Sequence, residues 1–172
     1  MFRLVARADP QFLVEMLYEA VYWYDDGSEE RPALDAMIAE PHNARYVEAW
    51  GRPGDLAIVA LDRQEEAVGA AWCRFFSADA PGYGFVAENV PELSIAVYPE
   101  FRRTGVGGLL LGSLIARSRT TEARGMSLSV ARANPARSLY TRHGFVPVRE
   151  HDPAEASDPS TTSETMLLDY GS

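Results

Sequence analysis

Apolar residues near the N-terminus recur every three or four positions, which is the spacing of one face of an amphipathic helix. These residues are Leu13, Met16, Leu17, Ala20, Val21 and Tyr24. Asp9 followed by Pro10 is typical of a helix start, because an aspartate side chain caps the first turn and proline is tolerated at its first position. We expect a helix that ends near residues 25–27, after a short strand at 3–7 and before a second helix over 31–40.

The rest of the chain contains apolar runs of strand length and two further helical patterns. Strands are expected at 56–61, 67–76, 93–97, 126–131, 144–148 and 164–168. Helices are expected to begin at Gly105 and at Asn134, the second of them ending near Arg142. Residues 151–163 are rich in Asp, Pro, Ser and Thr, which is typical of a connection between strands. The order of the elements predicts one mixed α/β domain over residues 1–172.

The composition excludes several kinds of chemistry. All 16 basic residues are arginine, so no lysine is available for a Schiff base, for pyridoxal phosphate or for a lysine-containing phosphate loop. The single cysteine, Cys73, and three widely spaced histidines give no metal-ligand pattern, so we expect no metal site. The net charge of −9 argues against nucleic-acid binding, and no apolar run reaches the length of a membrane span. We therefore expect a cytoplasmic protein that binds neither nucleic acid nor membrane.

Charge is distributed unevenly along the chain. Residues 102–149 hold nine of the arginines and one acidic residue, Glu122, whereas the other segments hold seven arginines and 24 acidic residues. This segregation favours a polyanionic ligand on the basic segment and a cationic one near the acidic segments 25–40 and 150–169. The alternative is that the arginines only solvate the faces of two helices.

A glycine-rich turn, Arg-Arg-Thr-Gly-Val-Gly-Gly at 102–108, follows one predicted strand and opens the next helix. Such a position is suited to anions, because unpaired N–H groups of the first turn and the helix dipole both attract negative charge. The turn does not match the dinucleotide-binding pattern, which requires a glycine where this chain has Leu110. The alternative is a glycine-rich helix start that serves close packing only.

Two sequence blocks resemble a known family. Residues 97–110 resemble the acetyl-CoA signature of the GNAT superfamily of N-acetyltransferases, [QR]-x-x-G-x-[GA], with Arg102, Gly105 and Gly107 at the matching positions. Residues 134–145 are similar to the downstream N-x(5)-Y-x(3)-G-F element of the same superfamily. The resemblance implies a GNAT-like fold, with a central mixed, mostly antiparallel sheet whose strands splay apart, flanked by about four helices.

The resemblance also implies which residues bind acetyl-CoA. The backbone amides of the turn would hold the pyrophosphate, and Ile95 and Val97 on the preceding strand would bind the pantetheine arm and polarise the thioester carbonyl. The residues of the turn are Arg102, Arg103, Thr104, Gly105, Val106, Gly107, Gly108 and Leu109. Thr104 departs from the many members that have a basic residue there. Asn134 would contact pantetheine, or it would simply cap the following helix.

Transfer to an amine requires a base and an acid, because a primary amine is mostly protonated at neutral pH and a thiolate leaves more easily once protonated. The resemblance implies that the Tyr140 hydroxyl lies beside the CoA sulfur, so Tyr140 is the candidate acid and a cofactor contact, with a purely packed tyrosine as the alternative. The resemblance also places Glu92 in the region where many members carry a catalytic carboxylate, so Glu92 is the candidate base. Glu88 or a chain of waters are the substitutes, and a surface glutamate is the structural alternative. A buried thiol is expected for Cys73, rather than a nucleophile.

We therefore predict an acetyl-CoA-dependent N-acetyltransferase, in which a primary amine attacks directly within a ternary complex. The acceptor would be a small-molecule or peptide amine, and the acidic segments favour a cationic one. Homodimers are common in the superfamily. The alternatives are a non-catalytic acyl-CoA-binding or sensor module, and an interaction protein whose acidic surface binds a basic partner.

Overall fold

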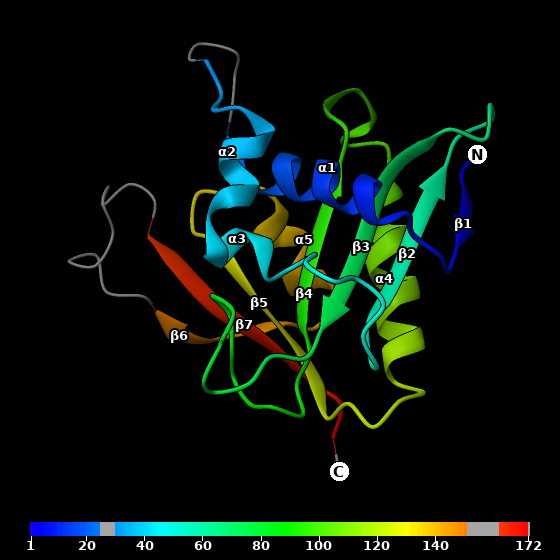
Figure 1. Cartoon of the computed structure of the whole chain (residues 1–172). Coiled ribbons are helices and arrows are strands. Elements are labelled where there is room, and N and C mark those ends of the chain that lie inside the picture. The colour runs from blue at the N-terminus through cyan, green and yellow to red at the C-terminus, as the bar shows by residue number, and fades with distance from the viewer. Residues whose placement is uncertain (25–29, 151–161, 172) are drawn as a thin grey trace. The chain divides into compact units, whose positions relative to one another are not determined.

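The computed structural model describes residues 1–24, 30–150 and 162–171 (Figure 1). Seven strands form one mixed sheet in the order β1-β2-β3-β4-β5-β7-β6, with five α helices among the described residues. The strands are β1 (Arg3–Val5), β2 (Leu56–Leu61), β3 (Ala67–Arg74), β4 (Glu92–Val97), β5 (Gly125–Ala131), β6 (Val146–Glu150) and β7 (Ser163–Asp169). The helices are α1 (Pro10–Val21), α2 (Leu34–Ala39), α3 (Pro41–Ala44), α4 (Val106–Ser118) and α5 (Ala136–Arg142), together with the 3₁₀ turn η1 (Pro99–Phe101). The predicted fold class is confirmed, with one more helix than expected.

The chain divides into two compact units, which are described separately below. Unit 1 comprises Met1–Arg74 and Ser94–Arg117. Unit 2 comprises Phe75–Leu93 and Ser118–Ser172. Strand β4 therefore begins in unit 2 and continues in unit 1. No helix in the described ranges combines the length and the apolar character that crossing a bilayer requires.

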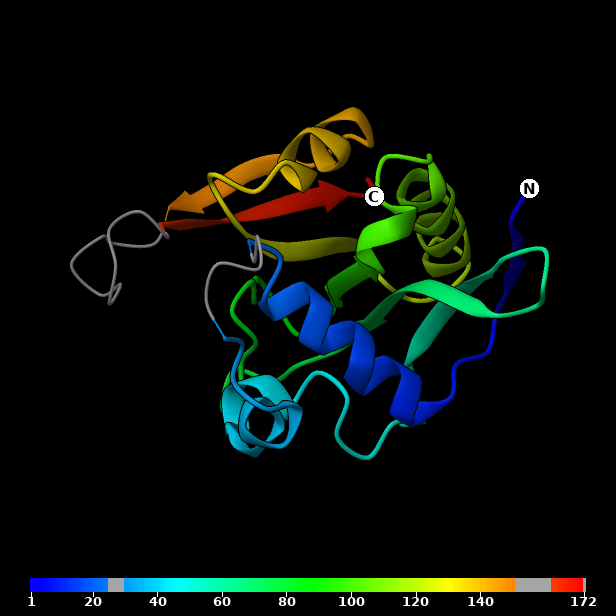
Figure 2. The same ribbon diagram turned by 90° about the horizontal axis from the view of Figure 1, so that it is seen from above.

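In unit 1, β1, β2 and β3 form an antiparallel sheet, and Figure 2 shows α1 and α4 on its two opposite faces. Both helices bury apolar side chains, although Leu109 of α4, which the helical spacing places among them, is 50% exposed. The fully buried side chains include Leu13 and Met16 of α1 and Leu110, Leu111 and Leu114 of α4. Gly69 of β3 lies against β4, since a Cβ there would meet the Ala96 carbonyl oxygen and Val97 Cγ2 at 3.0 Å.

The predicted start of α1 is confirmed, and its end comes earlier than predicted. The Asp9 carboxylate accepts hydrogen bonds from the amides of Gln11 and Phe12, at 2.8 and 3.3 Å. The helix ends at Val21, because Tyr22 leaves the helical region with φ −102° and ψ 39°. Tyr24, expected on the buried stripe, is 60% exposed. The expected end at residues 25–27 lies outside the described residues.

The helix expected over 31–40 is shorter than predicted and is followed by one that was not predicted. The helix α2 begins at Leu34, and Pro41 starts the single turn of α3 instead of ending a helical segment. Proline has the backbone angle of a helix and lacks only an N–H that the first turn leaves unpaired. Pro41 therefore marks the boundary of a helix, but the sequence does not show whether the helix ends before it or begins at it.

Unit 2 is built around β5, which pairs with β7 in seven antiparallel register positions. On its other side, the parallel ladder with β4 consists of the single pair Glu92–Ser127. Figure 2 shows α5 on one side of the strands β5, β7 and β6. The predicted glycine after α5 is confirmed, because Gly144 has a φ of +93°, a conformation that favours glycine.

Candidate functional site

The glycine-rich turn of unit 1 connects the end of β4 to α4 through η1. Arg103 has φ +61° and Gly105 has φ +88°, so two residues of the turn adopt left-handed backbone conformations. A Cβ on Gly105 would meet nothing within 4 Å. Backbone conformation, rather than space, therefore requires glycine at position 105. A left-handed arginine is uncommon, and such residues cluster at ligand-binding sites.

Six consecutive amides of this turn are available to a ligand. The Arg102 amide donates to the Pro99 carbonyl at 3.2 Å, and the Leu109 amide donates to the Gly105 carbonyl at 3.3 Å. Between them, the amides of residues 103–108 donate no hydrogen bond within the described part of the chain. The set of unbonded amides is therefore narrower than predicted by one residue at each end. Successive amides at a helix N-terminus, with left-handed residues among them, form a concave anion site.

The three polar side chains of the turn have different surroundings. Arg102 donates from Nε to the Val97 carbonyl at 3.3 Å and from Nη2 to Glu19 Oε2 of α1 at 3.2 Å. The Thr104 hydroxyl donates to the Phe101 carbonyl at 2.6 Å. Arg103 is exposed, and no described residue forms an ion pair with it. Arg102 is already paired with Glu19, so Arg103 is the positively charged side chain of the turn that can bind an anionic ligand.

Ile95 and Val97, the predicted pantetheine contacts, lie on the part of β4 that belongs to unit 1. Both side chains are partly exposed. The Val97 carbonyl oxygen accepts the hydrogen bond from Arg102 described above. The backbone N–H of Val97 is therefore the group that we consider for pantetheine.

Tyr140 lies on α5 in unit 2 and is 7% exposed. Its ring packs edge-on against Phe145, the other aromatic residue of the second sequence block, with 6.0 Å between the ring centroids. No described residue hydrogen-bonds its hydroxyl group. Burial raises the pKa of Tyr140 above that of an ordinary phenol, so the hydroxyl keeps its proton at neutral pH. A protonated hydroxyl without a partner is able to donate to a ligand.

Glu92 is 3% exposed, so the alternative of a surface glutamate is wrong. Its Oε1 accepts a hydrogen bond from the Gly84 amide at 2.8 Å. Gly84 is pressed against β5, since a Cβ there would lie 2.4 Å from the carbonyl carbon of Leu128. Glu88, the substitute base, is exposed and accepts a hydrogen bond from the Ala78 amide at 3.3 Å.

Two further candidates have clear local roles. Asn134 Oδ1 accepts a hydrogen bond from the Ala136 amide at 2.9 Å, so it holds the start of α5 from one residue before the N-cap residue Pro135. Cys73 is 1% exposed, and burial raises the pKa of its thiol to about 12, so the reactive thiolate is absent at neutral pH. The prediction of a buried thiol is confirmed. Within the described ranges, no group of three or more His, Cys, Asp or Glu residues is placed to hold a metal ion.

Glu19 is the residue near the turn that the sequence did not single out. It lies on α1, 83 residues before its partner Arg102, and it also pairs with Arg31. The sequence contains no signal for this contact, because nothing in a helical pattern indicates which distant strand the helix covers.

The model of the acetyltransferase (GNAT) family matches residues 15–145. The chain belongs to this family. As a member of this family, the protein is an acyltransferase. None of the curated protein sequences matches this chain significantly.

Several solved structures of acetyltransferases share the fold. One is a phosphinothricin acetyltransferase from Sinorhizobium meliloti in complex with acetyl-CoA, with 22% identity, a TM-score of 0.69 and coverage of 99% of this chain and 90% of the other. A second is YncA, a putative acetyltransferase from Salmonella typhimurium with its cofactor acetyl-CoA, with 20% identity, a TM-score of 0.70 and coverage of 99% and 95%. A third is a chimera of the spermidine N-acetyltransferase SpeG from Vibrio cholerae and hSSAT, with 20% identity, a TM-score of 0.64 and coverage of 98% and 95%.

Proposed function

We propose that this family member transfers the acetyl group of acetyl-CoA to a primary amine, by direct attack of the amine within a ternary complex. The observation that carries the proposal is the run of six unbonded amides at residues 103–108. A pyrophosphate group matches such a run, because it offers several charged oxygens to successive N–H donors. The acetyl-CoA present in two of the structurally similar acetyltransferases supports this choice of ligand.

The glycine-rich turn and the end of β4 would supply binding groups for acetyl-CoA. The turn would hold the diphosphate through its amides and through the exposed guanidinium of Arg103. Peptide groups of Ile95 and Val97 would hold the pantetheine arm and polarise the thioester carbonyl, which becomes more negative as the amine attacks. When bound, acetyl-CoA supplies the activated acyl carbon.

The proton-transfer groups would be Glu92 and Tyr140, the candidates that the sequence resemblance gives. Glu92 would accept the proton of the amine, directly or through water, because only the neutral amine is nucleophilic. Tyr140 would donate a hydrogen bond and a proton to the departing sulfur. Burial suits both roles, since charge that develops in a dry site interacts more strongly with these groups than it would in water. The side-chain NH₂ group of Asn134 would contribute to pantetheine binding, while its side-chain oxygen accepts the hydrogen bond from the Ala136 amide.

The proposal is tested by two measurements on the wild-type protein. Titration calorimetry with CoA should show binding, and release of free thiol from acetyl-CoA should appear with at least one amine of a broad panel. The panel should include spermidine and phosphinothricin, because two of the structurally similar proteins act on these amines by name. Binding without thiol release for every amine would instead support a non-catalytic acyl-CoA module, and absence of binding would end both interpretations.

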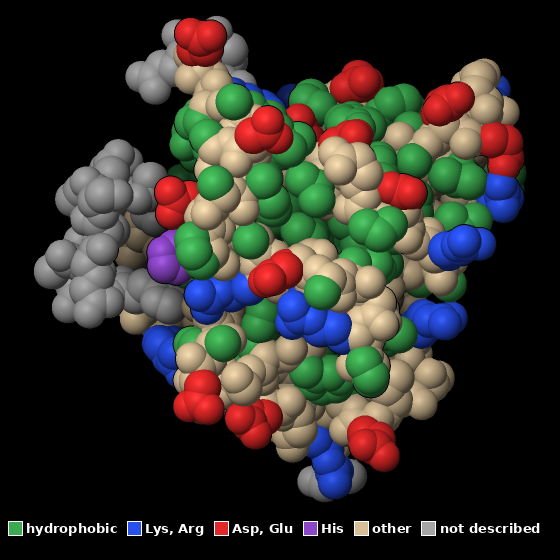
Figure 3. Space-filling model, viewed as in Figure 1, with side chains coloured by type: hydrophobic (Ala, Val, Ile, Leu, Met, Phe, Trp, Pro, Cys, Tyr) green, Lys and Arg blue, Asp and Glu red, His purple; other side chains and the backbone are tan. Residues whose placement is uncertain are grey.

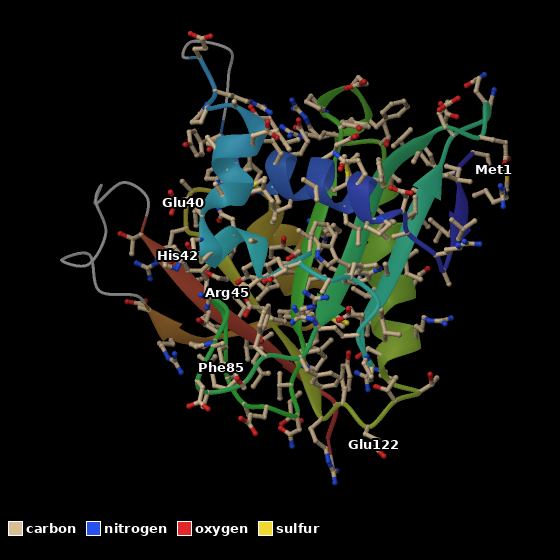
Figure 4. The ribbon with its side chains drawn as sticks, viewed as in Figure 1. Met1, Glu40, His42, Arg45, Phe85 and Glu122 are labelled. Atoms are coloured by element: carbon tan, nitrogen blue, oxygen red, sulfur yellow. The ribbon has the colours of Figure 1, made fainter. Side chains whose placement is uncertain are left out.

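We further propose a cationic acceptor. Glu30, Asp35 and Glu40 are all exposed in unit 1, and Figure 3 shows acidic side chains over α2. Figure 4 places Glu40 beside His42 on the outer side of α3. Negative potential there would concentrate a polyamine near the site. Salt screens this attraction beyond a Debye length of roughly 8–10 Å at physiological ionic strength, so the acceptor KM should rise with salt. A KM independent of salt would contradict this choice.

The base is tested by Glu92→Gln. The glutamine side-chain oxygen can still accept the Gly84 hydrogen bond, so the variant should fold while losing the proton acceptor. We expect kcat to fall by about 100-fold, the usual scale for general-base catalysis. Glu88→Gln is the matched control, because Glu88 also accepts one backbone hydrogen bond, and it should change kcat little. A large loss in the control and none in Glu92→Gln would transfer the role to Glu88.

The turn is tested by Gly105→Ala, which forces an L residue into a left-handed conformation. Strain should destabilise the fold by about 1 kcal/mol. It should also displace the amides and raise the Kd for CoA by about tenfold, or about 1.4 kcal/mol. Gly51→Ala is the matched control, since Gly51 has φ +106° and equally open surroundings. It should lose similar stability in urea unfolding and bind CoA normally; equal binding by both variants would contradict the role of the turn.

A further inference from the structure

We infer that Glu19 of α1 is a positioning residue for the turn, acting through Arg102. The inference rests on the proposed function, because it takes the diphosphate of CoA as the ligand of the turn. It assigns a role to a residue outside both sequence blocks. All of the groups that carry it belong to unit 1.

The Glu19 carboxylate is shared between two arginines. Oε2 accepts from Arg102 Nη2 at 3.2 Å, and Oε1 accepts from Arg31 Nη1 at 3.0 Å. The Glu19 side chain is 12% exposed, so its ion pairs are screened less by water and salt than those at the surface. One turn earlier on α1, Glu15 Oε2 accepts a hydrogen bond from the Tyr98 hydroxyl at 2.8 Å. The same face of α1 therefore binds the chain both before and after η1.

Arg102 is held from two sides. Its Nε donates to the Val97 carbonyl at the end of β4, and its Nη2 donates to Glu19. The side chain thus ties the first residue of the turn both to the preceding strand and to α1. Because its guanidinium has these partners, we assign Arg102 to holding the turn and Arg103 to the ligand, although the two arginines are neighbours in the sequence.

The geometry of the turn explains why such a hold is needed. The residue directly after Arg102 has φ +61°, a conformation that a non-glycine residue keeps only when its surroundings impose it. The six unbonded amides start at this residue. If Arg102 were released, the turn would sample other conformations, and the ligand would have to order it on binding. Loss of Glu19 should therefore weaken binding of CoA without changing the chemical step.

The experiment is a double-mutant cycle measured by calorimetry with CoA. Glu19→Gln and Arg102→Gln should each raise the Kd by about fivefold. The combined variant should bind no more weakly than Arg102→Gln alone, because both changes remove the same contact. Glu19→Gln combined with Arg103→Gln should instead show the product of the two single effects. At saturating acetyl-CoA, kcat of Glu19→Gln should stay within about twofold of wild type, since the lost energy is ground-state binding.

Glu65→Gln is the matched control, because it also removes the carboxylate partner of an arginine, Arg3, in unit 1. It should leave the Kd unchanged. Thermal unfolding of each variant shows whether it is folded. If Glu19→Gln does not fold, Arg102→Lys replaces it, because lysine keeps the positive charge but cannot donate to both Val97 and Glu19. An unchanged Kd in Glu19→Gln, or multiplicative effects of Glu19→Gln and Arg102→Gln, would overturn the inference. Wild-type protein that fails to bind CoA would overturn the proposed function itself.

Discussion

Replacing Tyr140 with phenylalanine is expected to lower kcat by about 100-fold and to leave the Kd for acetyl-CoA nearly unchanged. The change removes one hydroxyl group, which has no hydrogen-bond partner among the described residues. The ring that packs against Phe145 remains. Because no intramolecular hydrogen bond is lost, the stability of the fold should not fall. Single-turnover thiol release and calorimetry measure the two effects separately.

The pH profile of the wild-type protein gives a second check on Tyr140. Burial raises the pKa of this phenol above its ordinary value of about 10, so the protonated form that donates to sulfur persists below that pH. Ionisation of Tyr140 should therefore cause no loss of kcat between pH 7 and about pH 10. Tyr170→Phe is the control and should leave kcat unchanged. Tyr170 is a tyrosine of unit 2 that lies outside both sequence blocks, beneath the Arg119 guanidinium. Normal turnover in Tyr140→Phe would remove the assignment of the acid.

Replacing Asp55 with asparagine is expected to destabilise unit 1 by about 3 kcal/mol. Asp55 forms a two-point ion pair with Arg74, whose Nε and Nη2 donate at 2.9 and 2.6 Å. The Arg74 and Asp55 side chains are 1% and 3% exposed, so the variant would leave a buried positive charge without its counterion. Arg74 Nη1 also donates to the carbonyls of Arg45 and Glu48, at 2.9 and 2.7 Å. The side chain of Arg74 thus attaches the segment between α3 and β2 to the end of β3.

Urea unfolding measures this loss as a lower midpoint with an unchanged slope. The control is Glu65→Gln, which breaks the ion pair between the exposed residues Arg3 and Glu65 and should leave the midpoint unchanged. If Asp55→Asn unfolds at the same urea concentration as wild type, the buried pair contributes little to stability. A hydrophobic pair of similar volume would then serve as well there.

Most elements of the fold follow from local patterns. The helix start at Asp9, the strand Leu56–Leu61 and the glycine after α5 all depend on residues close together in the chain. The helix α3 does not follow from the sequence, because Pro41 fits the end of one helix as well as the start of the next. The end of α1 was misplaced because three consecutive aromatic residues continue an apolar pattern beyond the last helical turn.

The candidate site divides in the same way. The sequence by itself determined the family, through two blocks whose glycines and polar residues stand at fixed spacings, and it located the turn, Tyr140 and Glu92. Only the tertiary structure decided which amides of the turn remain unbonded, that Glu92 is buried against Gly84, and that Arg102 belongs to Glu19 while Arg103 remains exposed. The physical reason is that a turn or a helix cap is formed by neighbours along the chain. The partner of a charged side chain is instead selected by packing between segments far apart in sequence, and two adjacent arginines look alike until that packing is known.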